Sequence, residues 1–257
     1  MKKRLDQLLV ELGRFTSRSR AQAAILAGQV FVKGQKIDKA GALIPPDTEI
    51  EVKGNEHPYV SRGGLKLAQA LREFKIDVKD KVALDIGAST GGFTDCLLQH
   101  GAAKVYAVDV GYGQLAWKLR QDPRVKVFER LNARYLKPGD LGLATPRRCS
   151  GQAGDCELAT IDVSFISLSK ILPAVYNLLA EGAGVVALIK PQFEARREQV
   201  GKGGIVKDEQ VRQEVVERVK TAAGAIGFEV KGVVGSPITG ADGNVEFLIH
   251  LIKKAKA

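Results

Sequence analysis

Four charged side chains lie beside or within apolar stretches where an unpaired charge is costly. Asp162 and Lys190 each end an apolar run that is typical of a buried strand. Glu246 lies inside a third such run, and Lys66 lies in the first turns of an expected helix. These two acids and two lysines could converge on one edge of a sheet. The alternative is that they are separate surface or strand-end charges.

Two lysines with two carboxylates could activate an alcohol. Methyl transfer to a ribose hydroxyl requires the hydroxyl to lie in line with the donor and to lose its proton. An unperturbed lysine has a pKa near 10.4 and is a poor base at neutral pH. A second ammonium group and partial burial lower such a pKa, and carboxylates hold the amines in position. The set therefore predicts a hydroxyl-activating site without a metal.

Other methylation chemistries fit this sequence less well. An amine or ring-nitrogen methylase would more often show an Asn/Asp-Pro-Pro-aromatic element, whereas the strand before Asp162 continues as Asp-Val-Ser-Phe. No pair of cysteines is spaced as in enzymes that methylate base carbons.

A strand, a glycine-rich turn and a helix follow one another over residues 82–98. This arrangement brings backbone N–H groups close to a nucleotide-like ligand. The turn lacks both the Gly-x-Gly-x-x-Gly pattern of dinucleotide sites and the Gly-Lys-Ser/Thr of phosphate-binding loops. Asp85, just before the turn, would suit an ammonium group, and Asp109 at the end of the next strand would accept hydrogen bonds from a ribose diol. We expect S-adenosylmethionine here; a nicotinamide cofactor or a purely structural turn are the alternatives.

Strands and helices alternate after residue 80, which indicates a mainly parallel, doubly wound α/β sheet with ligands at its carboxyl edge. The expected strands are 82–86, 104–109, 125–128, 158–162, 184–190, 228–234 and 244–251, and an amphipathic helix is expected at 208–225. We expect the last strand to be antiparallel and to form an edge, as in Rossmann-like class I methyltransferases.

The first fifty residues predict a small α+β unit with two helices, near residues 5–12 and 21–26, and short strands at 30–32, 35–37 and 48–52. Basic residues greatly outnumber acidic ones over residues 1–39. Arg18 and Arg20 flank the start of the second helix, where phosphates could meet side chains and helix N–H groups together. The alternative is a solvated basic face.

This unit resembles the alpha-L RNA-binding module found in a small-subunit ribosomal protein, in pseudouridine synthases and in tyrosyl-tRNA synthetases. The resemblance rests on Arg4-Leu5-Asp6, Ser17 to Ala21, Ile25, Gly28, Val30, Val32, Lys33-Gly34 and Thr48 to Val52. It implies binding of structured RNA. The cations that we expect to contact RNA are Arg4, Arg18, Arg20, Lys33, Lys36 and Arg62. We expect this domain over residues 1–54, a linker over 55–62 and a methyltransferase domain over 63–257.

Nearly the entire chain, with both domains, resembles the TlyA (haemolysin A) family of ribosomal-RNA ribose 2′-O-methyltransferases, which are related to FtsJ-type enzymes. The similar segments are residues 61–67, 84–95, 107–115, 162–168 and 189–194. The resemblance implies a catalytic set of Lys66, Asp162, Lys190 and Glu246. It places S-adenosylmethionine contacts at Asp85, Gly87, Ala88, Ser89, Thr90, Gly91, Gly92, Phe93 and Asp109, and an adenine-side contact at Asn132.

Residues 138–157 depart from the family pattern and predict a flexible surface loop, rich in Gly, Pro and Ala. It contains Cys149 and Cys156, for which a metal site or a redox pair are the less favoured alternatives to an inert insertion. Arg147 and Arg148 in the same loop could touch RNA.

The whole-chain composition narrows the class of protein. The formal net charge is +10 over 257 residues, with 45% hydrophobic and 26% charged residues, which favours a globular protein with a polyanionic partner. An odd number of cysteines, no signal-peptide pattern and no long apolar stretch predict a cytoplasmic protein without a membrane partner. We expect ribosomal RNA or ribosomal subunits as the partner; the alternatives are a non-catalytic RNA-binding protein and a membrane-active haemolysin.

Overall fold

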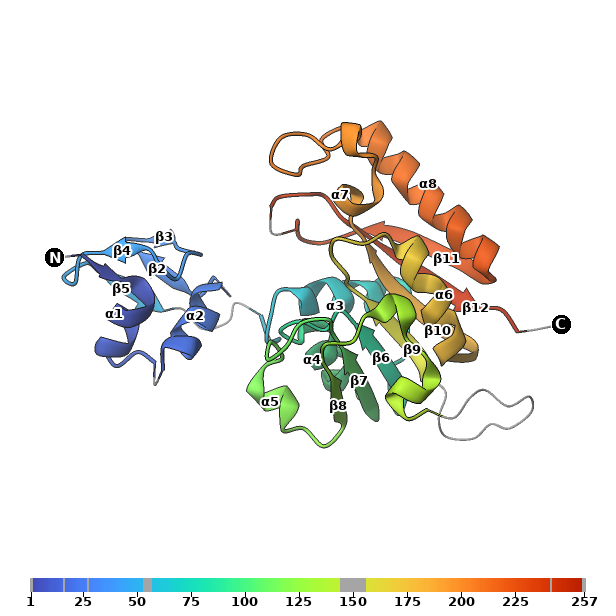
Figure 1. The fold of residues 1–257 in the computed structure, drawn as a ribbon, viewed down its shortest axis with the longest axis horizontal. Helices are drawn as coiled ribbons and strands as arrows, with labels where there is room; N and C mark the ends of the chain where they lie inside the picture. Colours follow the sequence, from blue (N-terminus) through green and yellow to red (C-terminus); the bar gives the residue numbers. More distant parts are fainter. Residues whose placement is uncertain are drawn as a thin grey trace. The chain divides into compact units, whose positions relative to one another are not determined.

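The computed structural model describes residues 2–15, 17–26, 28–52, 57–143, 156–240 and 242–255. The chain divides into two compact units, residues 1–62 and residues 63–257 (Figure 1). The exact limits of the expected linker stay a prediction, since residues 53–56 lie outside the described part.

The first unit packs two helices against short antiparallel strands. Its elements are β1 (Lys3–Arg4), α1 (Leu5–Glu11), α2 (Arg18–Leu26), β2 (Val30–Val32), β3 (Gln35–Lys36), β4 (Leu43–Ile44) and β5 (Ile50–Val52). The strands β3, β2 and β5 form one sheet, and β1 pairs with β4 separately. The core includes Leu5, Leu9, Ile25 and Val30, all completely buried. Helix α1 lies where it was expected, because its apolar spacing faces this core. Helix α2 begins at Arg18, three residues before the expected start, so Arg18 and Arg20 lie within its first turn.

The second unit is built on a seven-stranded sheet. In chain order its strands are β6 (Val82–Ile86), β7 (Lys104–Val108), β8 (Val125–Phe128), β9 (Cys156–Ile161), β10 (Leu179–Ile189), β11 (Phe228–Gly235) and β12 (Phe247–Lys253). Their order across the sheet is β11-β12-β10-β9-β6-β7-β8. The chain starts in the middle at β6 and winds outward in both directions, so the strand order reverses between β6 and β9. Ligands of such sheets bind at the carboxyl end of this crevice.

Helices are interleaved with the strands. They are α3 (Gly63–Glu73), α4 (Gly92–Gln99), α5 (Trp117–Arg120), α6 (Leu168–Leu178), α7 (Pro191–Glu194) and α8 (Glu209–Ile226), with 3-10 turns η1 (Ala133–Tyr135), η2 (Pro138–Leu141) and η3 (Arg197–Gln199). Helix α3 packs beside α4, and α6 packs beside α8 (Figure 1). Leu84 and Ile86 of β6 join the core formed with α6 and α8. Since side chains alternate along a strand, Asp85 between them points to the other face.

The last strand corrects one expectation. β12 is antiparallel to both of its neighbours, as predicted, but it is not an edge strand. The chain leaves β10, crosses over through α8 to β11 at the edge, and then returns between β10 and β11. A hairpin return of this kind places the final strand one position inside the sheet.

The predicted limits of the surface loop at 138–157 are also wrong at both ends. Residues 138–141 form the turn η2, and Cys156 is a buried residue of β9. Acidic neighbours on both sides of Cys156 hide the start of the strand in the sequence. Cys149, Arg147 and Arg148 lie outside the described residues.

Within the described ranges, no helix is both long and apolar enough to cross a membrane.

Candidate active site

The glycine turn after β6 passes close to the strand next to it. Gly87 has a φ of +81°, and a Cβ atom there would lie 2.4 Å from the backbone oxygen of Asp162. Gly91 has a φ of +99°, and its Cβ would lie 2.3 Å from a methyl group of Leu119. Gly87 therefore requires glycine for backbone conformation and for space, whereas Gly91 requires it chiefly for its positive φ, because the ends of leucine side chains can move. The turn is held between the end of β9 and α5 before α4 begins at Gly92.

Asp85 lies beneath this turn. Its side chain is completely buried, and one carboxylate oxygen accepts a hydrogen bond from Thr94 Oγ1 at 2.6 Å. The other accepts one from Thr160 Oγ1 at 2.9 Å. Burial raises the pKa of Asp85 to about 6, because the charged form loses its hydration. The carboxylate is thus an anchor under the turn, and not an exposed group at its surface.

Asp109 follows β7 and joins two loops. Its carboxylate accepts hydrogen bonds from the Ser89 N–H at 2.8 Å and the Gly111 N–H at 2.7 Å. Ser89 adopts a φ of +48°, which is uncommon for a residue with a side chain. Each carboxylate oxygen keeps a lone pair, so the group still fits a ribose diol.

Two further predicted cofactor residues, Phe93 and Asn132, differ in their exposure to solvent. Phe93 is buried in the first turn of α4. Asn132 is exposed, and its side chain caps η1 by accepting a hydrogen bond from the Arg134 N–H at 3.0 Å. An adenine-side role for Asn132 therefore stays a prediction.

Lys66 forms a buried ion pair. It extends from α3, and its Nζ lies 2.5 Å from Oε2 of Glu246. Both side chains are nearly inaccessible, and Glu246 lies just before β12. Each charge compensates the other, which removes most of the cost of burying them.

Lys190 forms a second pair. Its Nζ lies 2.6 Å from Oδ1 of Asp162 and donates a hydrogen bond to Ser164 Oγ at 3.0 Å. Lys190 follows β10 and Asp162 follows β9, two neighbouring parallel strands.

Strand register brings the two pairs to the same edge. Ile189 of β10 lies opposite Phe247 of β12, so Lys190 and Glu246 occupy the next positions on neighbouring strands. The Asp162 N–H donates to Ile86 O, directly before the glycine turn. All four predicted residues thus lie at the carboxyl edge of β9 and β10, beside the turn.

Sequence reasoning missed an exposed aromatic residue at this edge. Phe165 is 90% exposed, has a φ of +64° and lies one residue after Ser164. Its ring contacts that of Phe193, with centroids 4.9 Å apart. A large aromatic residue directly after Ser164, just past the end of an apolar strand, was the signal that could have singled it out.

Glu194 links the two loops that carry Asp162 and Lys190. Its carboxylate accepts hydrogen bonds from Ser167 Oγ at 2.6 Å and from the Leu168 N–H at 2.7 Å, at the start of α6. Burial raises its pKa. The sequence alone did not indicate this contact, because it depends on the neighbouring positions of β9 and β10.

In the first unit, a buried acid holds two of the predicted RNA-binding cations. Asp6 is completely buried. It receives hydrogen bonds from Arg4 Nε at 3.1 Å, Arg18 at 3.1 Å and Gln22 at 2.7 Å. The Arg4 guanidinium holds the pKa of Asp6 well below its usual range. Arg4 and Arg18 remain about half exposed, so Asp6 fixes their direction and leaves one side open.

The other predicted cations are spread over this unit. Arg20 lies on α2, Lys33 forms the hairpin turn with a φ of +50°, and Lys36 lies on β3 beside Gly28. Arg62 is exposed at the end of the unit.

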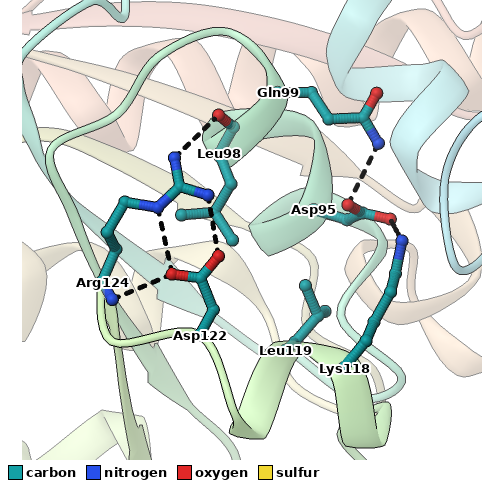
Figure 2. A pocket seen from close by; sticks show the side chains of 7 residues that line it. All are labelled: Asp95, Leu98, Gln99, Lys118, Leu119, Asp122 and Arg124. Carbon is teal, nitrogen blue, oxygen red and sulfur yellow. Dashed lines mark hydrogen bonds and ion pairs between the residues drawn. The ribbon is translucent and has the colours of Figure 1, made fainter.

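A separate hollow lies between α4 and α5, where Lys118 Nζ lies 2.9 Å from Asp95 (Figure 2). Gln99 contacts the same carboxylate, and Arg124 pairs with Asp122 on the other side. Its polar groups are thus engaged with one another, and none of the predicted site residues lines it.

A sheet that winds outward from a central strand, with a glycine turn at its switch point and acids at the carboxyl ends of the first two strands, defines a Rossmann-type methyltransferase. Residues 59–253 match the FtsJ-like methyltransferase family, and residues 3–50 match the S4 domain. The chain belongs to the FtsJ-like methyltransferase family, whose methyl donor is S-adenosylmethionine.

Similar proteins cover nearly the whole chain. YqxC of Bacillus subtilis is 55% identical, over 97% of this chain and 85% of its own. The 16S/23S rRNA (cytidine-2′-O)-methyltransferase TlyA of Mycobacterium tuberculosis is 45% identical, over 96% of this chain and 89% of its own. A solved structure from Streptococcus thermophilus, described as a hemolysin, is 49% identical with a TM-score of 0.75, covering 99% of this chain and 90% of its own.

Proposed function

We propose that this protein transfers a methyl group from S-adenosylmethionine to the ribose 2′-hydroxyl of a cytidine in ribosomal RNA. The observation that carries the proposal is the meeting of two lysine–carboxylate pairs at the carboxyl edge, beside the glycine turn. Similarity to TlyA, named for this activity, supports the substrate.

The donor would lie along the turn of residues 87–93. Asp109 would accept hydrogen bonds from the ribose diol of the donor, and its contacts to Ser89 and Gly111 fix it for that role. Asp85 would favour the methionine ammonium electrostatically from beneath the turn, while Thr94 and Thr160 hold it. Asn132 is proposed at the adenine side. When bound, S-adenosylmethionine supplies an electrophilic methyl group.

The acceptor hydroxyl would lie at Lys190. The Lys190 amine would act as the base that takes the hydroxyl proton, while the methyl group would pass from the donor to the oxygen and the donor's sulfur would keep the electron pair. Asp162 and Ser164 orient the amine. Lys66 and Glu246 form the second wall of the site and hold the sugar, a proposal that needs no metal.

The acceptor base would meet Phe165. Aromatic side chains that are exposed beside a nucleic-acid site stack on bases, at about 1–3 kcal/mol each. Phe193 supports the Phe165 ring from one side, so the exposed face is held ready for a base.

The polymer would be bound first by the S4 domain. Arg4 and Arg18, directed by Asp6, offer a half-exposed pair of guanidinium groups to phosphates. Arg20, Lys33, Lys36 and Arg62 would extend this surface. A ribosomal substrate would make this a cytoplasmic enzyme, and we propose whole ribosomal subunits as well as free RNA as partners.

The test is incorporation of labelled methyl groups into bacterial 16S and 23S rRNA, followed by mapping of 2′-O-methyl positions. We expect wild type to label cytidine and Lys190→Ala to lose at least about 100-fold in kcat, as for removal of a proton acceptor. Binding of S-adenosylmethionine should be unchanged in that variant.

Two results would decide against the proposal. A wild-type protein that binds rRNA without methylating it would be a non-catalytic RNA-binding protein. Full activity of Lys190→Ala would show that the proton leaves by another route. Lysis of liposomes by RNA-free protein would instead support the membrane-active alternative.

A further inference from the structure

A second group of cations lies on the catalytic unit, in the loop between α7 and α8. We call residues 196–207 the basic loop. Arg196, Arg197, Lys202 and Lys207 are all exposed there, and Glu198 is the single acid in this stretch. Within the described residues, no ion pair joins any of these four cations to a carboxylate. Other surface lysines, such as the half-buried Lys220 and the exposed Lys231, do have acidic partners.

The basic loop is held in a defined conformation. The Gly201 N–H donates to Ile205 O, and the Gly204 N–H donates to Gly201 O. Arg212 of α8 donates through Nε to Val206 O at 3.0 Å, and Val206 is completely buried. The cations therefore lie on an ordered support, which lowers the entropy cost of binding a ligand.

Asn244 connects the basic loop to the candidate active site. Its side chain is buried; Oδ1 accepts from the Val206 N–H at 3.0 Å, and Nδ2 donates to Gly204 O at 2.9 Å. Asn244 lies two residues before Glu246. The loop itself begins two residues after α7, which directly follows Lys190. In Figure 1 the loop before α8 and the segment before β12 lie on the same side of the sheet.

The surface of the basic loop suits a polyanion with an accessible backbone. Gly203 and Gly204 both have positive φ, and no atom lies within 4 Å of a Cβ built at either position. A phosphate can therefore approach the chain closely between Lys202 and Lys207. The loop carries no exposed large apolar side chain, which a membrane-inserting segment would need.

We propose that the basic loop binds the sugar-phosphate backbone of rRNA beside the methylated nucleotide, and that Asn244 is a positioning residue that keeps this contact in register with Glu246. The inference rests on the proposed function. It adds a second RNA contact on the catalytic unit, independent of the S4 domain.

The test uses the full-length variant Lys202→Ala/Lys207→Ala. Its matched control is Lys75→Ala/Lys79→Ala, which removes two exposed lysines just before β6, at the opposite edge of the sheet. The dissociation constant for bacterial 16S and 23S rRNA is measured at several salt concentrations. We expect affinity to fall about tenfold near physiological salt and the slope of log K against log salt to fall by roughly 1.5, for two lost phosphate contacts. The control should match wild type.

Asn244→Ala tests the connection. We expect a raised KM for rRNA, an unchanged dissociation constant for S-adenosylmethionine, and a lowered kcat because the acceptor is held less well. Combined with Lys202→Ala/Lys207→Ala, it should add little to the loss of RNA affinity, since both changes act through one contact.

Several results would overturn the inference. These are an unchanged salt slope in Lys202→Ala/Lys207→Ala, an equal loss in the control, or binding of the loop to anionic phospholipid vesicles with no effect on RNA. If wild type methylates rRNA and the loop variant behaves like it, only this inference fails. If wild type does not methylate rRNA, the proposed function fails first.

Discussion

At the scale of single residues, the two acids at the carboxyl ends of β6 and β7 have different environments. Asp109 has its carboxylate between two loop N–H groups, whereas Asp85 is sealed under the turn by two threonine hydroxyls. The raised pKa of Asp85, about 6, makes its charge sensitive to mild acid. Asp85 is therefore where donor binding and pH should be linked.

We predict that S-adenosylmethionine binds more weakly as the pH falls from 7.5 to 5, because Asp85 becomes neutral. Asp85→Asn should bind weakly over the whole range and show little of this pH dependence. Isothermal titration calorimetry at each pH measures both. Tight binding of S-adenosylmethionine by Asp85→Asn at pH 7.5 would show that the Asp85 charge does not contribute to donor binding.

The pKa of Asp85 also links pH to folding stability, and here low pH is favourable, in contrast to its expected effect on donor binding. The folded-state pKa of Asp85 lies above the unfolded value, so between about pH 4 and 6 the folded protein holds a proton that the unfolded chain releases. This group therefore favours folding at low pH, and that contribution is lost as the pH rises through 6. Urea unfolding at several pH values should show this fall in the free energy of unfolding for wild type and not for Asp85→Asn.

Phe165 gives a second prediction at this scale. Phe165→Ala should raise KM for rRNA or lower kcat by about tenfold through lost stacking, while Phe165→Tyr keeps most activity. Thermal stability should hardly change, because the ring is 90% exposed. Wild-type kinetics in Phe165→Ala would show that the base is held elsewhere.

At the scale of elements, the sequence predicted most strands of the second unit to within a few residues, because their apolar runs are bounded by glycine, proline or charge. It did not predict β1 and β4, which are two residues long and mostly exposed. It also missed the start of β10 at Leu179, since an irregular register between Leu179 and Gly184 interrupts the pattern. The identities of Lys66, Asp162, Lys190 and Glu246 came from the sequence. Which lysine pairs with which acid did not, because that depends on the register of β10 with β12.

The burial of Lys253 at the end of β12 could not be predicted from the sequence pattern. It is buried at the end of β12, and its Nζ donates to the Tyr176 O at 2.8 Å and the Leu179 O at 2.6 Å, where α6 ends. A cation satisfies carbonyls at a helix end and interacts favourably with its dipole. The lysine thus joins the last strand to the junction of α6 and β10.

We predict that Lys253→Met lowers the free energy of unfolding by about 2–3 kcal/mol, because two buried carbonyls lose their charged donor. Denaturant unfolding measures this, and Lys231→Met, on the exposed part of β11, is the control with little expected change. Equal stability of Lys253→Met and wild type would show that water or other donors replace the amine.

At the scale of the whole molecule, we propose that the first unit mainly binds RNA and that the second binds the methyl donor. The second unit has its own sheet and core, whereas the first has a small core and clustered cations. Much of the affinity for RNA would therefore reside outside the unit that carries the donor turn.

We predict that residues 63–257 alone fold and bind S-adenosylmethionine like the full chain, but bind rRNA at least about tenfold more weakly, with a smaller salt dependence. Calorimetry with the donor and filter binding with rRNA at two salt concentrations test both halves of this prediction. Full RNA affinity of the fragment would mean that the S4 domain is not the main docking surface.

The close approach of Gly87 to the backbone oxygen of Asp162 has a consequence for the design of new specificities. The proposed donor and acceptor sites would share this main-chain contact, so we expect a displacement on either side to be transmitted to the other. An engineer seeking a different acceptor should keep this contact fixed and vary the side chains beyond it, at positions such as Phe165 and Phe193. We expect that even a single methyl group added at Gly87 would disturb both proposed binding sites at once.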